Sequence, residues 1–140
     1  MRVVIDTNIF ISGIFFGGKP RKILNLIEKK VIIPCFNVLT FTELEFLLRN
    51  EKFNSQKKLL SFSIDDFIDK IKERSLIFLQ PSKVPVIIKE DLADNYIIAC
   101  AISARASFII SGDKHLLKLK KFKNISIVSP KEFFQRRRFH

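Results

Sequence analysis

Short runs of apolar residues with almost no polar interruption recur along this chain, and longer segments separate them. The first run, residues 2–5, is rich in β-branched side chains and does not alternate apolar with polar positions. Such a run is typical of a strand buried on both faces, as strands are in parallel sheets. Similar runs occupy residues 31–33, 76–79, 108–110 and 125–128. The pattern predicts an α/β fold in which helices flank a central parallel sheet.

The segments between these runs have helical spacing or helix end signals. Ser63 with Asp66 three residues later, for example, is typical of a capping box. The expected helices cover about residues 23–30, 37–50, 64–74 and 92–105, with a short one after Gly112. No repeat or linker interrupts the 140 residues, so we expect a single domain, 1–140.

Composition excludes several classes of protein. The chain is 47% hydrophobic and contains fifteen Phe, which is enough apolar material for a core without disulfides and excludes intrinsic disorder. Its two cysteines, Cys35 and Cys100, stand alone in apolar runs, so we expect reduced core residues. No apolar run approaches the roughly 18 residues of a membrane-spanning helix, and the amino terminus lacks the apolar stretch of a signal peptide. We expect a cytoplasmic protein with no membrane contact.

Lys and Arg exceed Asp and Glu by 25 to 14, a formal net charge of +11. This excess suits either a polyanionic partner or a strongly solvated surface. Within this basic chain, two acids occupy unusual places. Asp6 directly follows the first apolar run, and Asp113 follows the run at 108–110. Ligands of open parallel sheets bind at the carboxyl ends of strands, which makes both positions functional candidates. The alternative is an Asp that begins a turn or caps a helix.

Two further acids occupy helical segments. At about 100° per residue, Glu43 falls between Leu39 and Leu47, which predicts that it points to the apolar side of its helix, with Glu45 on the solvent side. Asp94 opens a helix and shares a face with apolar residues of the next turns. An acid in the first turn also suits the helix dipole by itself. Asp91 is a candidate helix cap or a peripheral metal ligand.

Four carboxylates at one edge of a sheet would repel one another, and burying them unpaired costs several kcal/mol each. A divalent cation removes this cost, and all-oxygen ligands favour Mg²⁺ or Mn²⁺. Such an ion can activate water and stabilise the charge that develops when a phosphodiester is hydrolysed. The basic background then suits a polyanionic substrate.

The residues that carry this hypothesis also occur in a characteristic order. Along the chain they are Asp6-Thr7-Asn8, Glu43, Asp94 and Ser111-Gly112-Asp113 with Leu116-Leu117, followed by Ser129-Pro130-Lys131-Glu132-Phe133. This ordered set resembles the PIN-domain ribonucleases, most closely the single-domain prokaryotic toxins similar to VapC. The resemblance implies the PIN fold, which is a Rossmann-like α/β/α sandwich with a central parallel sheet. It also implies a Mg²⁺- or Mn²⁺-dependent RNase, frequent homodimers and inhibition by an antitoxin protein.

The resemblance also implies roles for individual residues. It makes Asp6, Glu43, Asp94 and Asp113 the catalytic and metal-binding acids, with Asp91 corresponding less clearly. Thr7, Asn8 and Ser111 become supporting residues. The main alternative is a PIN-fold RNA-binding module without catalytic turnover. A haloacid-dehalogenase phosphatase would need an Asp where Asn8 stands, and a dinucleotide site would need a GxGxxG motif that is missing here.

An acidic pocket repels the phosphates of RNA, so the flanking phosphates must be bound by cations that lie near the catalytic acids but outside the pocket. The densest cluster after Asp113 consists of Lys114, Lys118, Lys120, Lys121 and Lys123, and we expect it to bind RNA phosphates. A solvated helix face without a ligand is the alternative. The basic tail 136–138 suits a phosphate clamp, an antitoxin contact or a frayed end.

Overall fold

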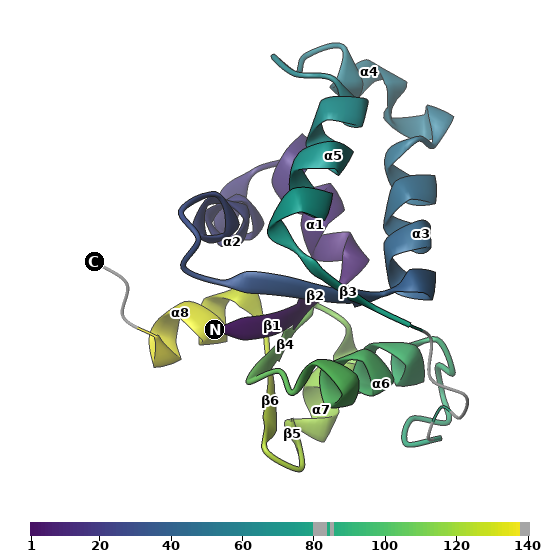
Figure 1. Cartoon of the computed structure of the whole chain (residues 1–140), viewed down its shortest axis with the longest axis vertical. Helices are drawn as coiled ribbons and strands as arrows, with labels where there is room; N and C mark the ends of the chain where they lie inside the picture. The colour runs from purple at the N-terminus through teal and green to yellow at the C-terminus, as the bar shows by residue number, and fades with distance from the viewer. Residues whose placement is uncertain (80–83, 85, 138–140) are drawn as a thin grey trace.

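The computed structural model describes residues 1–79, 84 and 86–137, and its centre is a six-stranded sheet (Figure 1). The strands lie in the order β3-β2-β1-β4-β6-β5, the first five parallel and β5 antiparallel. Their bounds are β1 (Arg2–Ile5), β2 (Ile33–Asn37), β3 (Leu76–Phe78), β4 (Phe108–Ile110), β5 (Lys121–Phe122) and β6 (Ile125–Val128). The predicted parallel sheet is confirmed, with one antiparallel strand at its edge.

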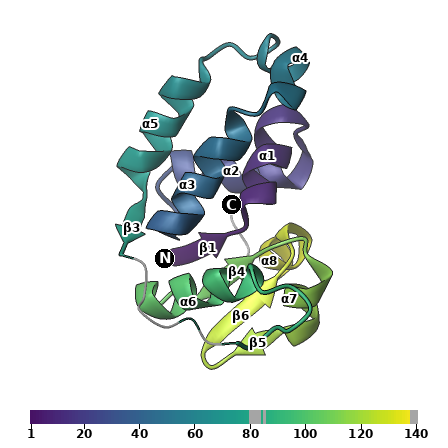
Figure 2. The same cartoon turned by 90° about the vertical axis from the view of Figure 1, so that its right-hand side faces the viewer.

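Helices cover both faces of the sheet, as Figure 2 shows from the side. On one face lie α1 (Thr7–Phe15), α2 (Gly18–Glu28), α3 (Val38–Leu48), α5 (Ile64–Arg74) and α8 (Pro130–Arg136). On the other face lie α6 (Asp94–Ala104) and α7 (Lys114–Leu119). A short 3₁₀ turn, Glu51–Phe53, and α4 (Asn54–Lys57) connect α3 to α5. The α/β/α sandwich expected from the sequence is therefore the observed architecture.

The core forms two clusters, one on each face of the sheet. In β1, Val3 and Ile5 pack into the cluster under α1, and Val4 packs into the cluster under α6. Both faces of this strand are buried, which explains why its sequence does not alternate. Cys35 and Cys100 are buried free thiols, as expected, and burial raises the pKa of Cys100 to about 12.

Polar side chains fix where several helices begin. Asn37 ends β2 and caps α3 through a reciprocal capping box with Thr40. Ser63 accepts a hydrogen bond from the Asp66 backbone N–H at the start of α5, which confirms the predicted N-cap, but the return bond to the Asp66 side chain that would complete a capping box is not made. These caps satisfy N–H groups that have no partner within the helix.

Some elements differ from the sequence prediction. The second strand is not 31–33 but β2, which contains Pro34. Pro34 pairs with Val3 of β1 only, before pairing with β3 begins at Cys35, so its missing N–H costs little there. The sequence did not predict α1, because residues 7–15 are apolar on most sides of the helix and hide the helical period.

Two other observations bear on the predicted organisation. In the described part of the chain, no helix has both the length and the apolar character needed to cross a membrane. Pro81 and Pro85, between the run at 76–79 and the helix expected at 92–105, and Arg138 of the basic tail lie outside the described residues.

Candidate carboxylate site

The carboxyl ends of β1 and β4 lie side by side and bring the first two predicted site residues together. Ile5 is in register with Ile110, and the Asp6 backbone N–H donates to the Ile110 carbonyl at 2.9 Å. Ser111 Oγ then donates to Asp6 Oδ2 at 2.7 Å. Asp6 Oδ1 accepts from the Asn8 backbone N–H at 3.2 Å. Asp6 is 6% exposed, so its carboxylate is buried but held by two hydrogen bonds.

Ser111 also positions the acid that follows β4. Its Oγ accepts from the Asp113 backbone N–H at 2.9 Å. Asp113 caps α7: its Oδ1 accepts from the N–H groups of His115 and Leu116 at 2.8 and 3.2 Å. The capping alternative is thus true of Asp113, and Asp6 likewise caps α1, yet only one of the two Asp113 carboxylate oxygens makes these bonds.

Asp94, in the first turn of α6, lies at the centre of a carboxylate cluster. Ligand oxygens of Asp91, Asp94 and Asp113 lie within 4.8 Å of one another. Asp94 is buried, and within the described residues its Oδ2 has no hydrogen-bond partner. The pKa of Asp94 is raised to about 7, first by burial and then by the negative charges around it, that of Asp113 foremost. Asp6 also contributes to this shift.

This cluster has the properties of a cation site. A buried carboxylate oxygen without a donor is costly unless a cation or a proton compensates it. Three carboxylates at this separation disfavour one another's ionised form, and a divalent cation relieves the repulsion. Asp91, predicted to be a helix cap or a peripheral metal ligand, therefore lies within this cluster.

Glu43 reaches the edge of the site, but not in the predicted way. It is exposed, and the residues around it on α3, Leu39 and Phe46, are 45% and 72% exposed. The buried side of α3 carries Phe41 and Leu44 instead. The predicted apolar side is wrong, because α3 has apolar residues over most of its circumference and the sequence pattern does not select the buried arc.

A hydrogen bond nevertheless connects Glu43 to the strand end. Thr7 Oγ1 donates to Glu43 Oε1 at 3.2 Å, and Thr7 directly follows Asp6. Thr7 is buried, whereas Asn8 is exposed and contributes its backbone N–H to Asp6. The site is thus arranged as Asp91, Asp94 and Asp113 close together, Asp6 beside them, and Glu43 at the rim.

Two asparagines that the sequence did not single out hold these acids in place. Asn95 is 2% exposed; its Oδ1 accepts from the N–H groups of Ile87 and Ile88 at 2.9 and 2.8 Å, and its Nδ2 donates to the Ile88 carbonyl at 2.7 Å. This fixes the loop before α6, which carries Asp91. Asn37 Nδ2 donates to the Tyr96 carbonyl at 3.3 Å and joins β2 to α6. An amide directly after Asp94, on an otherwise apolar helix, is the feature that could have revealed Asn95.

The predicted RNA-binding lysines divide between the two edges of the sheet. Lys114 is exposed and directly follows Asp113. Lys121 and Lys123 are exposed too, but they lie where β5 turns into β6. That turn is at the opposite edge, because β6 starts beside the start of β4, where the Ser126 N–H donates to the Ser107 carbonyl at 3.1 Å. The structure therefore does not gather the five lysines around Asp113.

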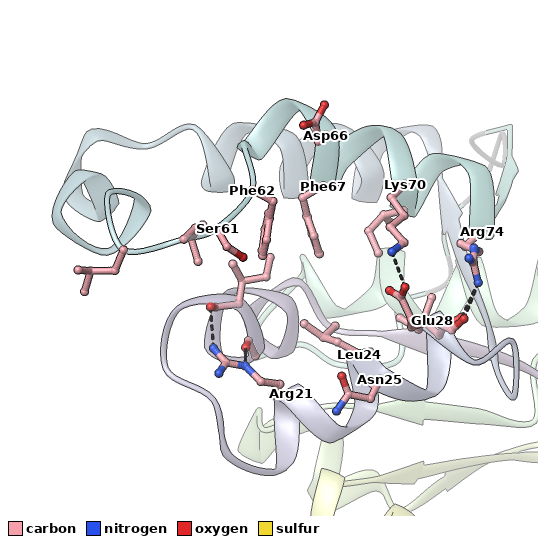
Figure 3. A pocket seen from close by; sticks show the side chains of 16 residues that line it. Arg21, Leu24, Asn25, Glu28, Ser61, Phe62, Asp66, Phe67, Lys70 and Arg74 are labelled. Carbon is pink, nitrogen blue, oxygen red and sulfur yellow. Dashed lines mark hydrogen bonds and ion pairs between the residues drawn. The ribbon is translucent and has the colours of Figure 1, made fainter.

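A separate cavity of about 680 Å³ lies between α2 and α5 (Figure 3). Several of its charged side chains are already engaged: Lys70 pairs with the Glu28 carboxylate, and Arg74 donates to the Glu28 backbone carbonyl at 2.6 Å. Arg21 donates to the carbonyls of Gly13 and Ile14. None of the clustered carboxylates lines this cavity, so the candidate catalytic chemistry lies elsewhere.

Comparison with known proteins agrees with this geometry. The family model described as PIN domain matches residues 2–115, which span the whole carboxylate cluster. The chain belongs to the PIN-domain family. It is 32% identical over 152 aligned positions to the uncharacterized protein MJ1680 of Methanocaldococcus jannaschii, covering 96% of this chain and 90% of that protein. PIN domains are generally nucleases, and the acidic cluster of this PIN domain is consistent with that chemistry.

A solved structure shares the fold of this PIN domain at low sequence identity. It is a chain in the crystal structure of VapBC2 from Rickettsia felis bound to a DNA fragment from their promoter. The TM-score is 0.57 at 16% identity, and the match covers 91% of this chain and 97% of that one. The predicted PIN fold is therefore confirmed.

Proposed function

We propose that this PIN domain is a divalent-metal-dependent endoribonuclease that hydrolyses RNA phosphodiester bonds and acts as the toxin of a toxin-antitoxin pair. The observation that carries the proposal is Asp94. Its buried Oδ2 has no partner among the described residues and lies in a cluster with Asp91 and Asp113. A group of this kind suits a cation better than a structural role, because a structural acid would find a donor.

The oxygen-only donor set fits Mg²⁺ or Mn²⁺. Asp94, Asp113 and Asp91 would hold the cation, with Asp6 and Glu43 as further ligands at the strand end and the rim. Such a cation supplies positive charge opposite the developing charge on the phosphate and lowers the pKa of a water.

The chain's own residues have three tasks in this proposal. Ser111 and the Asn8 N–H fix the direction of the Asp6 carboxylate. The α7 cap fixes Asp113, so its remaining oxygen has a defined position. Asp94, with its pKa raised to about 7, would be partly protonated near neutral pH in the metal-free protein and would bind a cation in its ionised form.

RNA is the proposed substrate because the chain carries a net charge of +11 around an acidic site. Only cations outside that site can bind the flanking phosphates. Lys114 and Lys118 on α7 are exposed and nearest in sequence to Asp113, and we assign them to the phosphates next to the cleaved bond. Lys120, Lys121 and Lys123 would bind more distant phosphates.

We further propose two protein partners, an antitoxin and a second copy of the chain, in the cytoplasm. Support comes from α3, where Val38, Leu39 and Phe46 are exposed beside Glu43. Exposed apolar groups that border a catalytic site are suited to a protein that covers it. The similarity in fold to a chain of a VapBC2 structure agrees with such a partner.

The test is cleavage of a generic RNA that carries a fluorophore and a quencher at its ends. Cleavage should require added Mg²⁺ or Mn²⁺, stop in excess EDTA and return when metal is restored. RNA binding without metal-dependent cleavage would instead support the catalytically silent RNA-binding module. Copurification with the product of a neighbouring small gene tests the antitoxin, and light scattering tests the dimer.

A further inference from the structure

The parallel strands begin at the side of the sheet opposite the carboxylates, and this side carries a row of cations. At the starts of neighbouring strands, the Ile33 N–H donates to the Met1 carbonyl and the Ser107 N–H donates to the Arg2 carbonyl. A third bond runs from the Ser126 N–H to the Ser107 carbonyl. Because of these three bonds, the segments that precede β2, β1, β4 and β6 lie side by side in that order. Their exposed cations are Arg2, Lys29, Lys30, Arg105, Lys121 and Lys123, which we call the basic edge.

The basic edge has no carboxylates of its own. The connections at 29–32, 105–107 and 123–124 contain no Asp or Glu, and neither does the start of the chain. The acid nearest to it in sequence, Glu28, is paired with Lys70 of α5. At about 4.8 Å between strands, the row from β2 to β5 spans roughly 19 Å. The connections that form the basic edge therefore supply no acid of their own to neutralise its positive charge.

The backbone at three of these positions is unusual for their side chains. Lys30, Arg105 and Lys123 have φ of 60°, 52° and 53°. Glycine is the least strained residue in this left-handed region. Among the described residues, the one other non-glycine with positive φ is Lys120, so all four are cations. Cations thus occupy positions where glycine would be conformationally easier, which points to a use for the charge.

Helix ends explain part of this arrangement but not all of it. Arg105 caps α6 and Lys30 follows the end of α2, and cations are favourable near helix C-termini. Lys123 lies in a hairpin turn and Arg2 in a strand, where no such dipole acts. Arg2 Nη1 donates to the Ala104 carbonyl at 3.1 Å, which places its guanidinium beside Arg105.

We propose that the basic edge binds the phosphate backbone of RNA and forms a second anchoring surface on the side opposite the carboxylate cluster. The inference rests on the proposed function for the choice of RNA over other polyanions. Lys118 on α7 lies between Lys114 at the site and the basic edge, so a long or folded RNA can contact both. A short RNA at the carboxylates would not reach the basic edge.

The test replaces Lys30, Arg105 and Lys123 together by Gly. Binding of a fluorescein-labelled uridine 20-mer is measured by anisotropy at several salt concentrations, in EDTA and in an Asp94→Asn background to prevent cleavage. The matched control replaces Lys19, Lys52 and Lys58, exposed cations elsewhere, by Ala. Since the binding assay needs no cleavage, it remains informative even if the protein proves not to be a ribonuclease.

We expect the glycine variant to bind the RNA at least about 10-fold more weakly at 0.1 M salt. The slope of the logarithm of the binding constant against the logarithm of the salt concentration should decrease in magnitude by about 2. Its Tm should stay equal or rise, because glycine relieves the backbone. The control variant should keep a slope close to that of the parent. An unchanged slope in the glycine variant, or an equal loss in the control, would overturn the proposal. The proposal would also be overturned if the glycine variant lost as much affinity for polyglutamate as for RNA.

Discussion

Ser111 joins the two acids of neighbouring strand ends, because its Oγ donates to Asp6 at 2.7 Å and accepts from the Asp113 backbone N–H at 2.9 Å. Its side chain is fully buried. One hydroxyl thus sets the direction of Asp6 and the start of the turn that carries Asp113.

Replacing Ser111 by Ala should remove both bonds. We expect a loss of about 1–3 kcal/mol in the free energy of unfolding, since Asp6 Oδ2 is left buried without its donor. RNA cleavage should fall by at least about 10-fold. Ser111→Thr, which keeps the hydroxyl, is the control and should retain most activity. Equal activity of the Ala variant and the parent would show that the hydroxyl does not position the acids.

Asp94 predicts how the stability of the metal-free protein depends on pH. Its pKa is about 7 in the folded protein and near 3.9 in the unfolded chain, so between these values the folded state binds more protons. The free energy of unfolding should therefore fall as pH rises from about 4 to 7 and level off above. Asp94→Asn should lack this component and gain about 1–3 kcal/mol over the parent at pH 8.

Urea unfolding at pH 5 and pH 8 in EDTA measures this difference. The exposed Asp69→Asn variant is the control, because Asp69 lies on α5, away from the cluster. Parallel pH profiles for the parent and Asp94→Asn would contradict the raised pKa.

Metal should stabilise the fold by mass action. At 100 times its Kd, Mn²⁺ should add about 2.7 kcal/mol to the free energy of unfolding, because it binds the folded protein and not the separated acids of the unfolded chain. Thermal melts with increasing Mn²⁺ should show Tm rising with concentration. A Tm that does not change with Mn²⁺ at millimolar concentration would contradict the proposal that the carboxylate cluster binds a divalent cation.

The two acids of α3 provide a matched pair. Glu43→Gln should reduce RNA cleavage by about 10-fold or more at limiting metal, because Glu43 is the α3 acid that contacts Thr7 beside Asp6. Glu45→Gln should change cleavage little. Neither variant should lose more than about 0.5 kcal/mol of stability, since both side chains are at least partly exposed. The reverse ranking would show that Glu45 is the functional acid.

The sequence predicted the strands where burial leaves an uninterrupted apolar run, as in β1 and β4. It misplaced β2 because Val31 and Ile32 belong to the connection, and the strand proper contains a proline. The proximity of Asp6 and Asp113 was predictable, because each follows a parallel strand and the carboxyl ends of parallel strands meet at one edge of the sheet. The orientation of Glu43 was not, since an all-round apolar helix carries no information about which side is buried.

The site also depends on contacts that no local pattern contains. Asn95 bonds to a loop seven and eight residues earlier in the chain, and Asn37 bonds to α6 across 59 residues. The separation of Lys123 from Asp113 results from the antiparallel turn of β5, a two-residue strand too short to predict.

The most direct test of the central claim is Mn²⁺ binding, measured by electron paramagnetic resonance of the free ion for the parent, Asp94→Asn and Asp69→Asn at pH 7.5. The carboxylate cluster predicts saturable binding to the parent and to Asp69→Asn, weakened at least about 10-fold in Asp94→Asn. Binding of equal strength in all three proteins, or no saturable binding to the parent, would contradict the claim that the carboxylates around Asp94 hold the catalytic cation.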